Sequence, residues 1–218
     1  MKKSFVVIGL GRFGASVTKS LIENGQEVLA IDKDENRVNE YMNIATHAVV
    51  ANAQDESVLK SLGIRNFDGV VVAIGEDIQA SILITLMVKE AGVDLLWVKA
   101  HNEHHAKVLE RIGADKVIHP ERDMGQRTAH RLITKNLLDY IELSDSFTVA
   151  EIKISSNKIT EKNLAELNLT QRFGVNVIAI RRKDGEVELA SAQSRIHQED
   201  CILLLGDDRA IERFDEYL

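Results

Sequence analysis

A glycine motif placed directly after the first apolar run constrains this chain more than any other feature. Residues 4–8 are rich in Phe, Val and Ile, as a β-strand is, and Gly9, Gly11 and Gly14 follow in the spacing G-x-G-x-x-G. Gly9 permits a tight turn, Gly11 lets the backbone approach a phosphate, and Gly14 lets the next helix pack closely on the strand. Asp32 ends the next β-rich run, where its carboxylate can accept hydrogen bonds from ribose hydroxyls. The motif predicts a nucleotide site; the alternative is a glycine turn without a ligand.

The first 120 residues repeat one rhythm, in which a short β-rich run is followed by a helical pattern. The predicted strands cover 4–8, 27–31, 46–51, 69–74, 94–99 and 116–118. The predicted helices cover 13–24, 35–42, 56–62, 78–91 and 103–112. Strict alternation of this kind predicts a parallel sheet with helices on both faces. Six strands are the number in a complete dinucleotide fold, so we expect a Rossmann-like, doubly wound α/β domain over 1–120.

Further ligand contacts are expected at the carboxyl ends of the later strands, because ligands of open α/β sheets bind there. The residues at these ends are Asn52, Ala53, Ala73, Ile74, Gly75, Lys99 and Ala100. Phe13, beside the glycine motif, and Lys33, beside Asp32, complete the predicted site. Asn52 can hydrogen-bond a base, although loops also use Asn and Gly simply to turn.

Composition excludes several classes of protein. The net charge of −7 opposes a general nucleic-acid binder, because phosphate contacts need clustered Lys and Arg. The longest apolar candidate, 80–88, is far shorter than the roughly 20 residues of a membrane span, so we expect no direct membrane insertion. The first residues do not form a signal peptide. The single cysteine, Cys201, is expected to be a buried thiol, which fits a cytoplasmic protein.

Two features could suggest chemistry. His101 and His105 have the i, i+4 spacing of a helical metal site, but Asn102 between them is a typical helix cap, so we favour a solvated helix start. Ser81 lies inside a helical pattern without a nucleophile elbow. We find no catalytic constellation and expect a protein that is not an enzyme.

The rhythm changes after Pro120, the only proline, which suits the first turn of a helix. Apolar residues then recur at helical spacing to about Tyr140. We therefore predict a connector and dimerisation helix over 121–143. The remaining residues, 144–218, predict a small α+β domain. Its expected strands are 147–154, 175–182, 186–190 and 201–205, and its expected helices are 161–173 and 210–218.

The chain resembles the RCK (KTN) domains of bacterial potassium-uptake regulators, and in particular the cytosolic subunit of Ktr transporters. The resemblance rests on these segments: 5–14 (FVVIGLGRFG), Asn52-Ala53, 63–67 (GIRNF), 72–75 (VAIG), 78–81 (IQAS), 107–115 (KVLERIGAD) and 119–124 (HPERDM). It extends over the whole chain and implies an N-terminal RCK domain, a connector helix and a C-terminal RCK domain.

The resemblance implies a regulatory, gating role in the cytoplasm. Ktr regulators form homodimers that assemble into octameric rings, attached to the membrane only through a membrane-embedded potassium-translocating subunit. ATP activates these systems and ADP inhibits them. A divalent cation (Mg or Ca) or Na can lie between paired nucleotide sites. Cyclic di-AMP binds the C-terminal domain of some members and inhibits uptake.

Individual residues carry over from the family by position. Arg12 matches an arginine near the terminal phosphate, and Asp32 matches the ribose-binding acid. Glu121 matches a glutamate that approaches the partner subunit's nucleotide and cation, which makes it the candidate metal ligand. Asn176 and Val177 fall at cyclic di-AMP contacts. Thr170 stands where that family often has arginine.

Two other functions start from the same glycine motif. An NAD-dependent oxidoreductase would need a catalytic residue near the nicotinamide and a substrate pocket, and NAD remains an alternative ligand in vitro. A redox-sensing DNA-binding protein would need a basic recognition helix, which the acidic balance of charge opposes. The identity of the nucleotide that co-purifies with the protein would separate these alternatives from a regulator.

Overall fold

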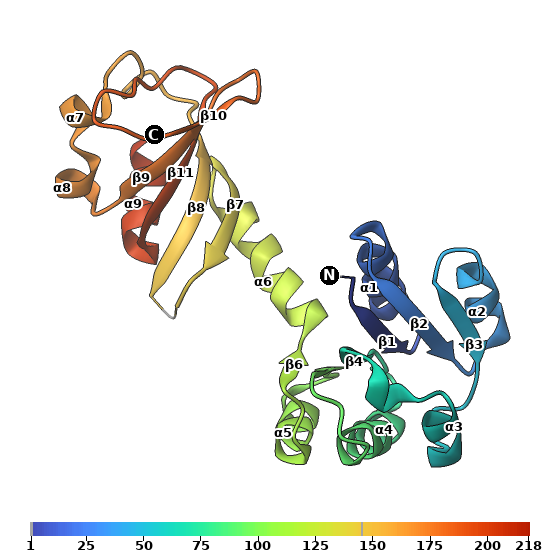
Figure 1. Cartoon of the computed structure of the whole chain (residues 1–218). Coiled ribbons are helices and arrows are strands. Elements are labelled where there is room, and N and C mark those ends of the chain that lie inside the picture. Colours follow the sequence, from blue (N-terminus) through green and yellow to red (C-terminus); the bar gives the residue numbers. More distant parts are fainter. Residues whose placement is uncertain (1, 145) are drawn as a thin grey trace. The chain divides into compact units, whose positions relative to one another are not determined.

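The structure is a computed structural model that describes residues 2–144 and 146–218. The chain divides into two compact units, Met1–Arg122 and Asp123–Leu218 (Figure 1). Each unit has its own sheet and its own apolar core.

The first unit is built on a six-stranded parallel sheet with the order β3-β2-β1-β4-β5-β6. Its strands are β1 (Ser4–Ile8), β2 (Glu27–Asp32), β3 (His47–Val50), β4 (Gly69–Val72), β5 (Leu96–Lys99) and β6 (Lys116–Ile118). The strand order reverses between β1 and β4, as in a doubly wound fold. This confirms the predicted fold class and all six predicted strands.

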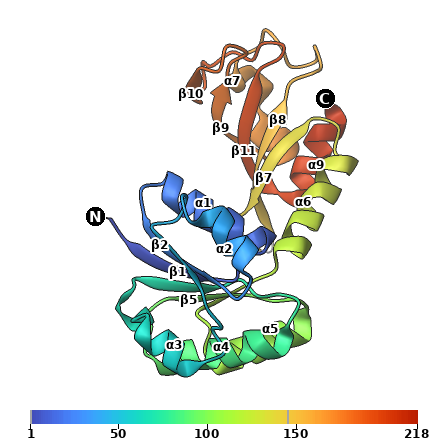
Figure 2. The same cartoon turned by 90° about the vertical axis from the view of Figure 1, so that its right-hand side faces the viewer.

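Helices cover both faces of this sheet. They are α1 (Arg12–Glu23), α2 (Glu35–Tyr41), α3 (Glu56–Ser61), the 3-10 turn η1 (Ile64–Asn66), α4 (Ile78–Glu90) and α5 (Glu103–Ile112). Figure 2 shows α1 and α2 on one face and α3, α4 and α5 on the other. Successive residues of β1 serve opposite faces: Val6 and Ile8 pack in the core with α4 and α5, and Val7 packs under α1. The sheet is therefore buried on both sides, as its continuous apolar strands require.

Most of these helices begin at a capping side chain. Asp34, Asp55, Asp77 and Asn102 precede α2, α3, α4 and α5, and each accepts a hydrogen bond from a backbone N–H of the first turn. Such a cap stabilises a helix by about 1 kcal/mol. The first helix differs, because its cap position is Gly11 and no side chain accepts a hydrogen bond there.

The second unit holds a five-stranded sheet with the order β10-β9-β11-β8-β7, antiparallel throughout. Its strands are β7 (Leu137–Glu142), β8 (Phe147–Lys153), β9 (Asn176–Arg181), β10 (Val187–Leu189) and β11 (Cys201–Asp207). Its helices are α7 (Leu164–Leu167), α8 (Leu169–Phe173) and α9 (Asp208–Tyr217), while α6 (Pro120–Ile133) contains the boundary between the units. Its core includes Ile152, Leu204 and Phe214. No helix of the described chain is long and apolar enough to cross a membrane.

The predicted connector helix over 121–143 is wrong in its second half. The helix ends at Ile133, and Leu137–Glu142 forms strand β7, which pairs with β8. The backbone N–H groups of Lys135 and Asn136 donate to the carboxylate of Asp215 on α9, which directs the chain onto the sheet. Leu137 then packs against the core of the second unit. The helical spacing of the apolar residues continues through this segment, but pairing with β8 and burial of Leu137 stabilise a strand instead.

The helix predicted over 161–173 is also divided in the structure. It forms two short helices, α7 and α8, because Asn168 between them adopts a left-handed conformation with φ of 45°. Asn tolerates this conformation better than most residues, so Asn168 within the helical pattern was the sequence signal that one helix ends there and another begins.

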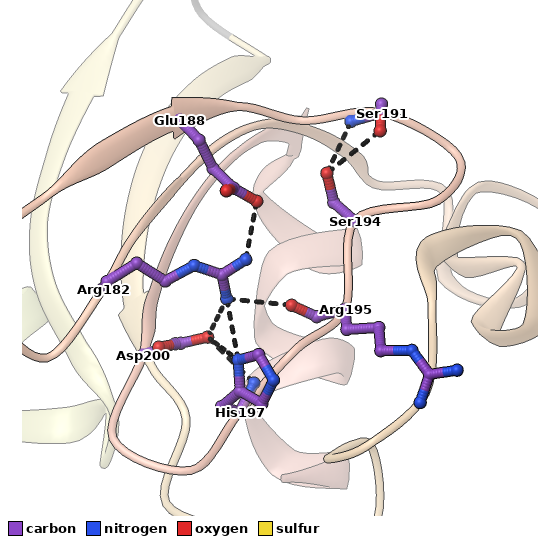
Figure 3. A network of polar contacts seen from close by, with 7 residues as sticks. All are labelled: Arg182, Glu188, Ser191, Ser194, Arg195, His197 and Asp200. Atoms are coloured by element: carbon purple, nitrogen blue, oxygen red, sulfur yellow. Dashed lines mark hydrogen bonds and ion pairs between the residues drawn. The ribbon is translucent and has the colours of Figure 1, made fainter.

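A polar cluster around Arg182 orders the long loop between β10 and β11. The Arg182 guanidinium donates to the carboxylates of Glu188 and Asp200, at 2.6 and 2.5 Å, and to the carbonyl oxygen of Arg195, at 2.9 Å (Figure 3). Asp200 is buried, and it also accepts the backbone N–H of His197. Arg182 thus neutralises the buried Asp200 carboxylate and holds the loop at two residues, Arg195 and Asp200.

We expect Arg182→Met to destabilise the second unit by about 3 kcal/mol, because breaking a buried ion pair leaves the Asp200 carboxylate without its cation. Urea unfolding followed by circular dichroism measures the change. Arg195→Met is the matched control, since the Arg195 side chain points away from the cluster (Figure 3). Equal unfolding midpoints for the two variants would contradict this role.

Candidate functional site

A cavity of about 650 Å³ opens at the carboxyl ends of the parallel strands, within the first unit. This volume is in the range of small-molecule sites, and the position is the one expected for a doubly wound sheet. The cavity brings together most of the residues that the sequence predicted: Gly9, Gly11, Arg12, Phe13, Asp32, Lys33, Asn52, Ala53, Ala73, Ile74, Gly75, Lys99 and Glu121.

Two predicted residues do not line the cavity. Ala100 is buried in the apolar core, one residue beyond the strand end. Gly14 lies behind the glycine loop, where a Cβ would fall 1.8 Å from the carbonyl oxygen of Gly9. Gly14 therefore has the packing role that the motif predicted, and it shapes the site without contacting the cavity.

The glycine loop presents the open start of α1 to the cavity. Gly9 has φ of +99°, which side chains rarely adopt, and its N–H donates to the carbonyl oxygen of Ile31 at 2.7 Å. No side chain caps α1, and its first turn holds no acidic residue. The positive end of the helix dipole is therefore uncompensated, which is the usual arrangement for binding a phosphate or another anion.

Asp32 ties this loop to the neighbouring turn. Its buried carboxylate accepts the N–H of Leu10 at 2.6 Å and the N–H of Asp34 at 2.9 Å. Arg37 on α2 places a guanidinium nitrogen 3.6 Å from the same carboxylate. The remaining lone pairs of Asp32 can accept hydrogen bonds from ribose hydroxyls.

Several lining residues were missed by the sequence analysis. They are Ile8, Ile31, Arg37, Ala51, Gln54, Glu76, Asp77, Ala80, Ile84 and His101. Arg37 had a signal, because it falls in the first turn of α2, a helix that starts beside the site. The apolar members had none, since they look the same as core residues in a sequence.

Lys99 and Glu121 form an ion pair on the cavity wall. Lys99 Nζ lies 2.6 Å from Glu121 Oε1, and this contact, with a smaller contribution from Arg12, lowers the pKa of the Glu121 carboxyl. Near the start of α6, the cavity thus brings the cationic side chains of Lys99 and Arg12 close to the ionised carboxylate of Glu121. Among the described residues, no group of three or more His, Cys, Asp or Glu side chains could hold a metal ion, so Glu121 would need oxygen ligands from elsewhere.

The histidine cluster forms the start of α5. Asn102 accepts the backbone N–H of His105, which confirms the predicted cap. The expectation of a solvated helix start is correct for His101 and His104 but wrong for His105, which is only 2% exposed. His105 Nδ1 accepts the backbone N–H of His101 at 3.1 Å, so its ring closes the turn after β5.

We expect His105 to make the first unit less stable in acid. Burial, with smaller contributions from His101 and His119, lowers the pKa of the His105 imidazole. As the pH falls below about 6.5, the unfolded chain binds the proton more readily than the folded chain, so stability present above that pH is lost.

Urea midpoints measured at pH 7.5 and 5.5 test this sign. His105→Asn should reduce the difference between the two pH values, whereas His104→Asn, on an exposed neighbour, should leave it unchanged. An undiminished difference in His105→Asn would assign the acid sensitivity to other groups.

In the second unit, Asn176 and Val177 are the first two residues of β9. The Thr170 hydroxyl donates to Asn176 Oδ1 at 2.8 Å. An arginine at this position would supply a positive charge to a phosphate ligand, which Thr170 does not. Asn176 and Val177 stay a prediction as cyclic di-AMP contacts, and the group beside Asn176 is an uncharged hydroxyl.

Models of two protein families match this chain, the TrkA-N domain over residues 5–120 and the TrkA-C domain over 149–218. A relative from Bacillus subtilis (strain 168), Ktr system potassium uptake protein C, is 50% identical over 99% of this chain and 97% of its own length. Ktr system potassium uptake protein A from the same organism is 48% identical over 98% of this chain and 96% of its own length.

A similar solved structure, the GsuK channel bound to NAD, superposes with a TM-score of 0.68 at 16% identity. The superposition covers all of this chain but only 39% of the channel chain, and it shows a shared fold. The two domain matches and the full-length relatives show more than fold. The chain belongs to the family of Ktr system potassium uptake proteins, with a TrkA-N domain followed by a TrkA-C domain.

Proposed function

We propose that this chain is the cytoplasmic, nucleotide-sensing regulatory subunit of a bacterial potassium uptake system, and that it is not an enzyme. The observation that carries the proposal is the cavity of the first unit, where the uncapped start of α1 and the buried Asp32 carboxylate lie together in a member of the Ktr family. These two groups suit the phosphates and the ribose of a nucleotide.

ATP and ADP are the proposed ligands, with ATP activating transport and ADP inhibiting it. Arg12 supports this choice, because it adds a guanidinium to a helix start that can hold a pyrophosphate through N–H groups alone. A cation at that end of a helix is unfavourable unless an anion compensates it. The additional charge of a third phosphate would supply that compensation.

NAD is the alternative ligand, and an oxidoreductase the alternative function. The GsuK channel bound to NAD is a channel of the same fold, so a dinucleotide in this fold does not by itself imply redox chemistry. Mass spectrometry of the nucleotide released from purified protein separates the two ideas. ATP or ADP supports the proposed ligands, whereas NAD alone would replace them, and only turnover of that NAD with a substrate would then favour the enzyme.

The proposed partner is the membrane-embedded potassium-translocating subunit, which would hold the chain at the membrane without insertion. Homodimers that assemble into an octameric ring are the proposed oligomer. A Mg, Ca or Na ion at Glu121 would bridge neighbouring nucleotide sites, and cyclic di-AMP at Asn176 and Val177 would be a second effector. The family membership supports these roles.

We expect Arg12→Ala to weaken ATP binding by about 1.5–3 kcal/mol, the range for hydrogen bonds to charged groups, and ADP binding by less. At about 1.4 kcal/mol per factor of ten, calorimetry should detect at least a tenfold loss for ATP. Arg65→Ala, on η1 away from the cavity, is the control. Equal losses for ATP and ADP would make Arg12 a general phosphate anchor.

The same variant tests regulation. A ligand shifts a conformational equilibrium only through different affinities for its states. In vesicles that contain the membrane subunit, Arg12→Ala should therefore respond less to the exchange of ADP for ATP than the wild type does. A full response would place the sensor elsewhere.

The apolar surface of α6 is the proposed assembly surface, in place of the helix to Tyr140 expected from the sequence. Met124 and Leu132 on α6 are 59% and 80% exposed, and two large apolar side chains exposed on one helix are a candidate contact for a partner, whereas a single exposed one needs no explanation. We expect Met124→Glu and Leu132→Glu to reduce the particle mass in light scattering. Met42→Glu, on a methionine that is 60% exposed next to α2, is the matched control and should not.

A further inference from the structure

The ion pair between Lys99 and Glu121 joins two different parts of the first unit. Lys99 is the last residue of β5, and Glu121 lies in the first turn of α6. Both side chains line the cavity, and Lys99 Nζ lies 2.6 Å from Glu121 Oε1. The pair therefore connects the wall of the proposed nucleotide site to the helix that contains the boundary between the units.

The two partners are held very differently. The Lys99 side chain is 15% exposed and the Glu121 side chain is 66% exposed. Lys99 passes over Gly75, where a Cβ would lie 3.0 Å from Lys99 Cε, so this glycine leaves room for the lysine stem. The lysine stem is held against the wall, whereas the carboxylate that accepts the hydrogen bond of its ammonium is close to solvent.

An exposed carboxylate is an easily replaced partner. Ion pairs whose carboxylate is exposed to solvent contribute little to stability, because water competes for the same charge. A polyphosphate in the cavity carries several negative charges and hydrogen-bond acceptors, so it can compete for the same ammonium. If it does, the Glu121 carboxylate is left beside the phosphates without the hydrogen bond from Lys99, the main contact that lowers its pKa.

We propose that Lys99 is the charge-balancing residue of the cavity: the phosphates of a bound nucleotide and the Glu121 carboxylate compete for its ammonium group. This inference rests on the nucleotide site proposed above. Without nucleotide, Lys99 neutralises Glu121 at the start of α6. With nucleotide, Lys99 turns to the phosphates, and Glu121 loses its partner and is repelled unless a cation binds. The charge of the phosphates thereby changes the electrostatic environment of Glu121 in the first turn of α6.

A double-mutant cycle measured by calorimetry tests the competition, with ATP and ADP in the presence of EDTA so that no divalent cation bridges the groups. Lys99→Met should weaken ATP binding about tenfold, the loss of one charge-assisted contact. Glu121→Gln should tighten it, because it removes both the competitor and the repulsion. Both effects should be smaller for ADP.

The decisive quantity is the effect of Glu121→Gln on ATP affinity, compared between the protein with Lys99 and the Lys99→Met variant. If the phosphates compete with Glu121, ATP binding has to break the ion pair, and this cost exists only when Lys99 is present. Glu121→Gln should therefore tighten ATP binding about threefold more in the protein that keeps Lys99 than in the Lys99→Met variant. Equal tightening in both backgrounds, or none in either, would overturn the inference while leaving the nucleotide site intact. A wild-type protein that binds neither nucleotide would instead overturn the proposed function, and the inference with it.

Two further variants serve as controls. Lys99→Arg keeps the charge and should retain most of the ATP affinity, so it distinguishes loss of charge from loss of folding. Lys89→Met removes the lysine of another ion pair, with Asp115, outside the cavity, and should leave ATP binding unchanged. A loss in Lys89→Met as large as that in Lys99→Met would show that the net charge of the protein, and not the pair, sets the affinity.

Discussion

The buried carboxylate of Asp32 is the interaction on which the proposed site depends. It accepts N–H groups from Leu10 and Asp34 and so joins the glycine loop to the turn after β2. A carboxylate buried with hydrogen bonds from fixed N–H groups is satisfied, whereas the same group without them would be costly to bury. Asp32 therefore holds the open start of α1 next to its own carboxylate, the group that would accept ribose hydroxyls in the proposed site.

The first unit could be predicted closely because its signals are local and agree with one another. Each strand is a short apolar run, each turn carries a polar cap such as Asp55 or Asn102, and the order of elements allows essentially one handedness of crossover. The glycine spacing then identifies the end of the sheet where a ligand would bind. Thirteen of the fifteen predicted contacts line one cavity because parallel strands bring their carboxyl ends to the same edge.

The remaining features depend on contacts between residues far apart in the sequence. Helical spacing continues past Ile133, and only the carboxylate of Asp215, on the last helix, and the partner strand β8 make Leu137–Glu142 a strand. Burial of His105 depends on its hydrogen bond to the turn after β5 and on the packing of α5 against the sheet. Nor could the sequence show that Glu121 has Lys99 as a partner within its own chain, since the two are 22 residues apart.

The ion pair between Lys99 and Glu121 changes the balance of charge in the cavity. A glutamate beside a phosphate site suggests a cation, because two anions would otherwise repel each other. With Lys99 at 2.6 Å, the carboxylate has a cation within its own chain, and in our proposal a further cation becomes necessary only when phosphates take the lysine away. A diphosphate and a triphosphate differ mainly in charge, so a shared ammonium is a direct way to convert that difference into a change at the start of α6. The helix continues past Arg122 into the second unit, so the covalent connection between the units begins at the residue whose partner is exchanged.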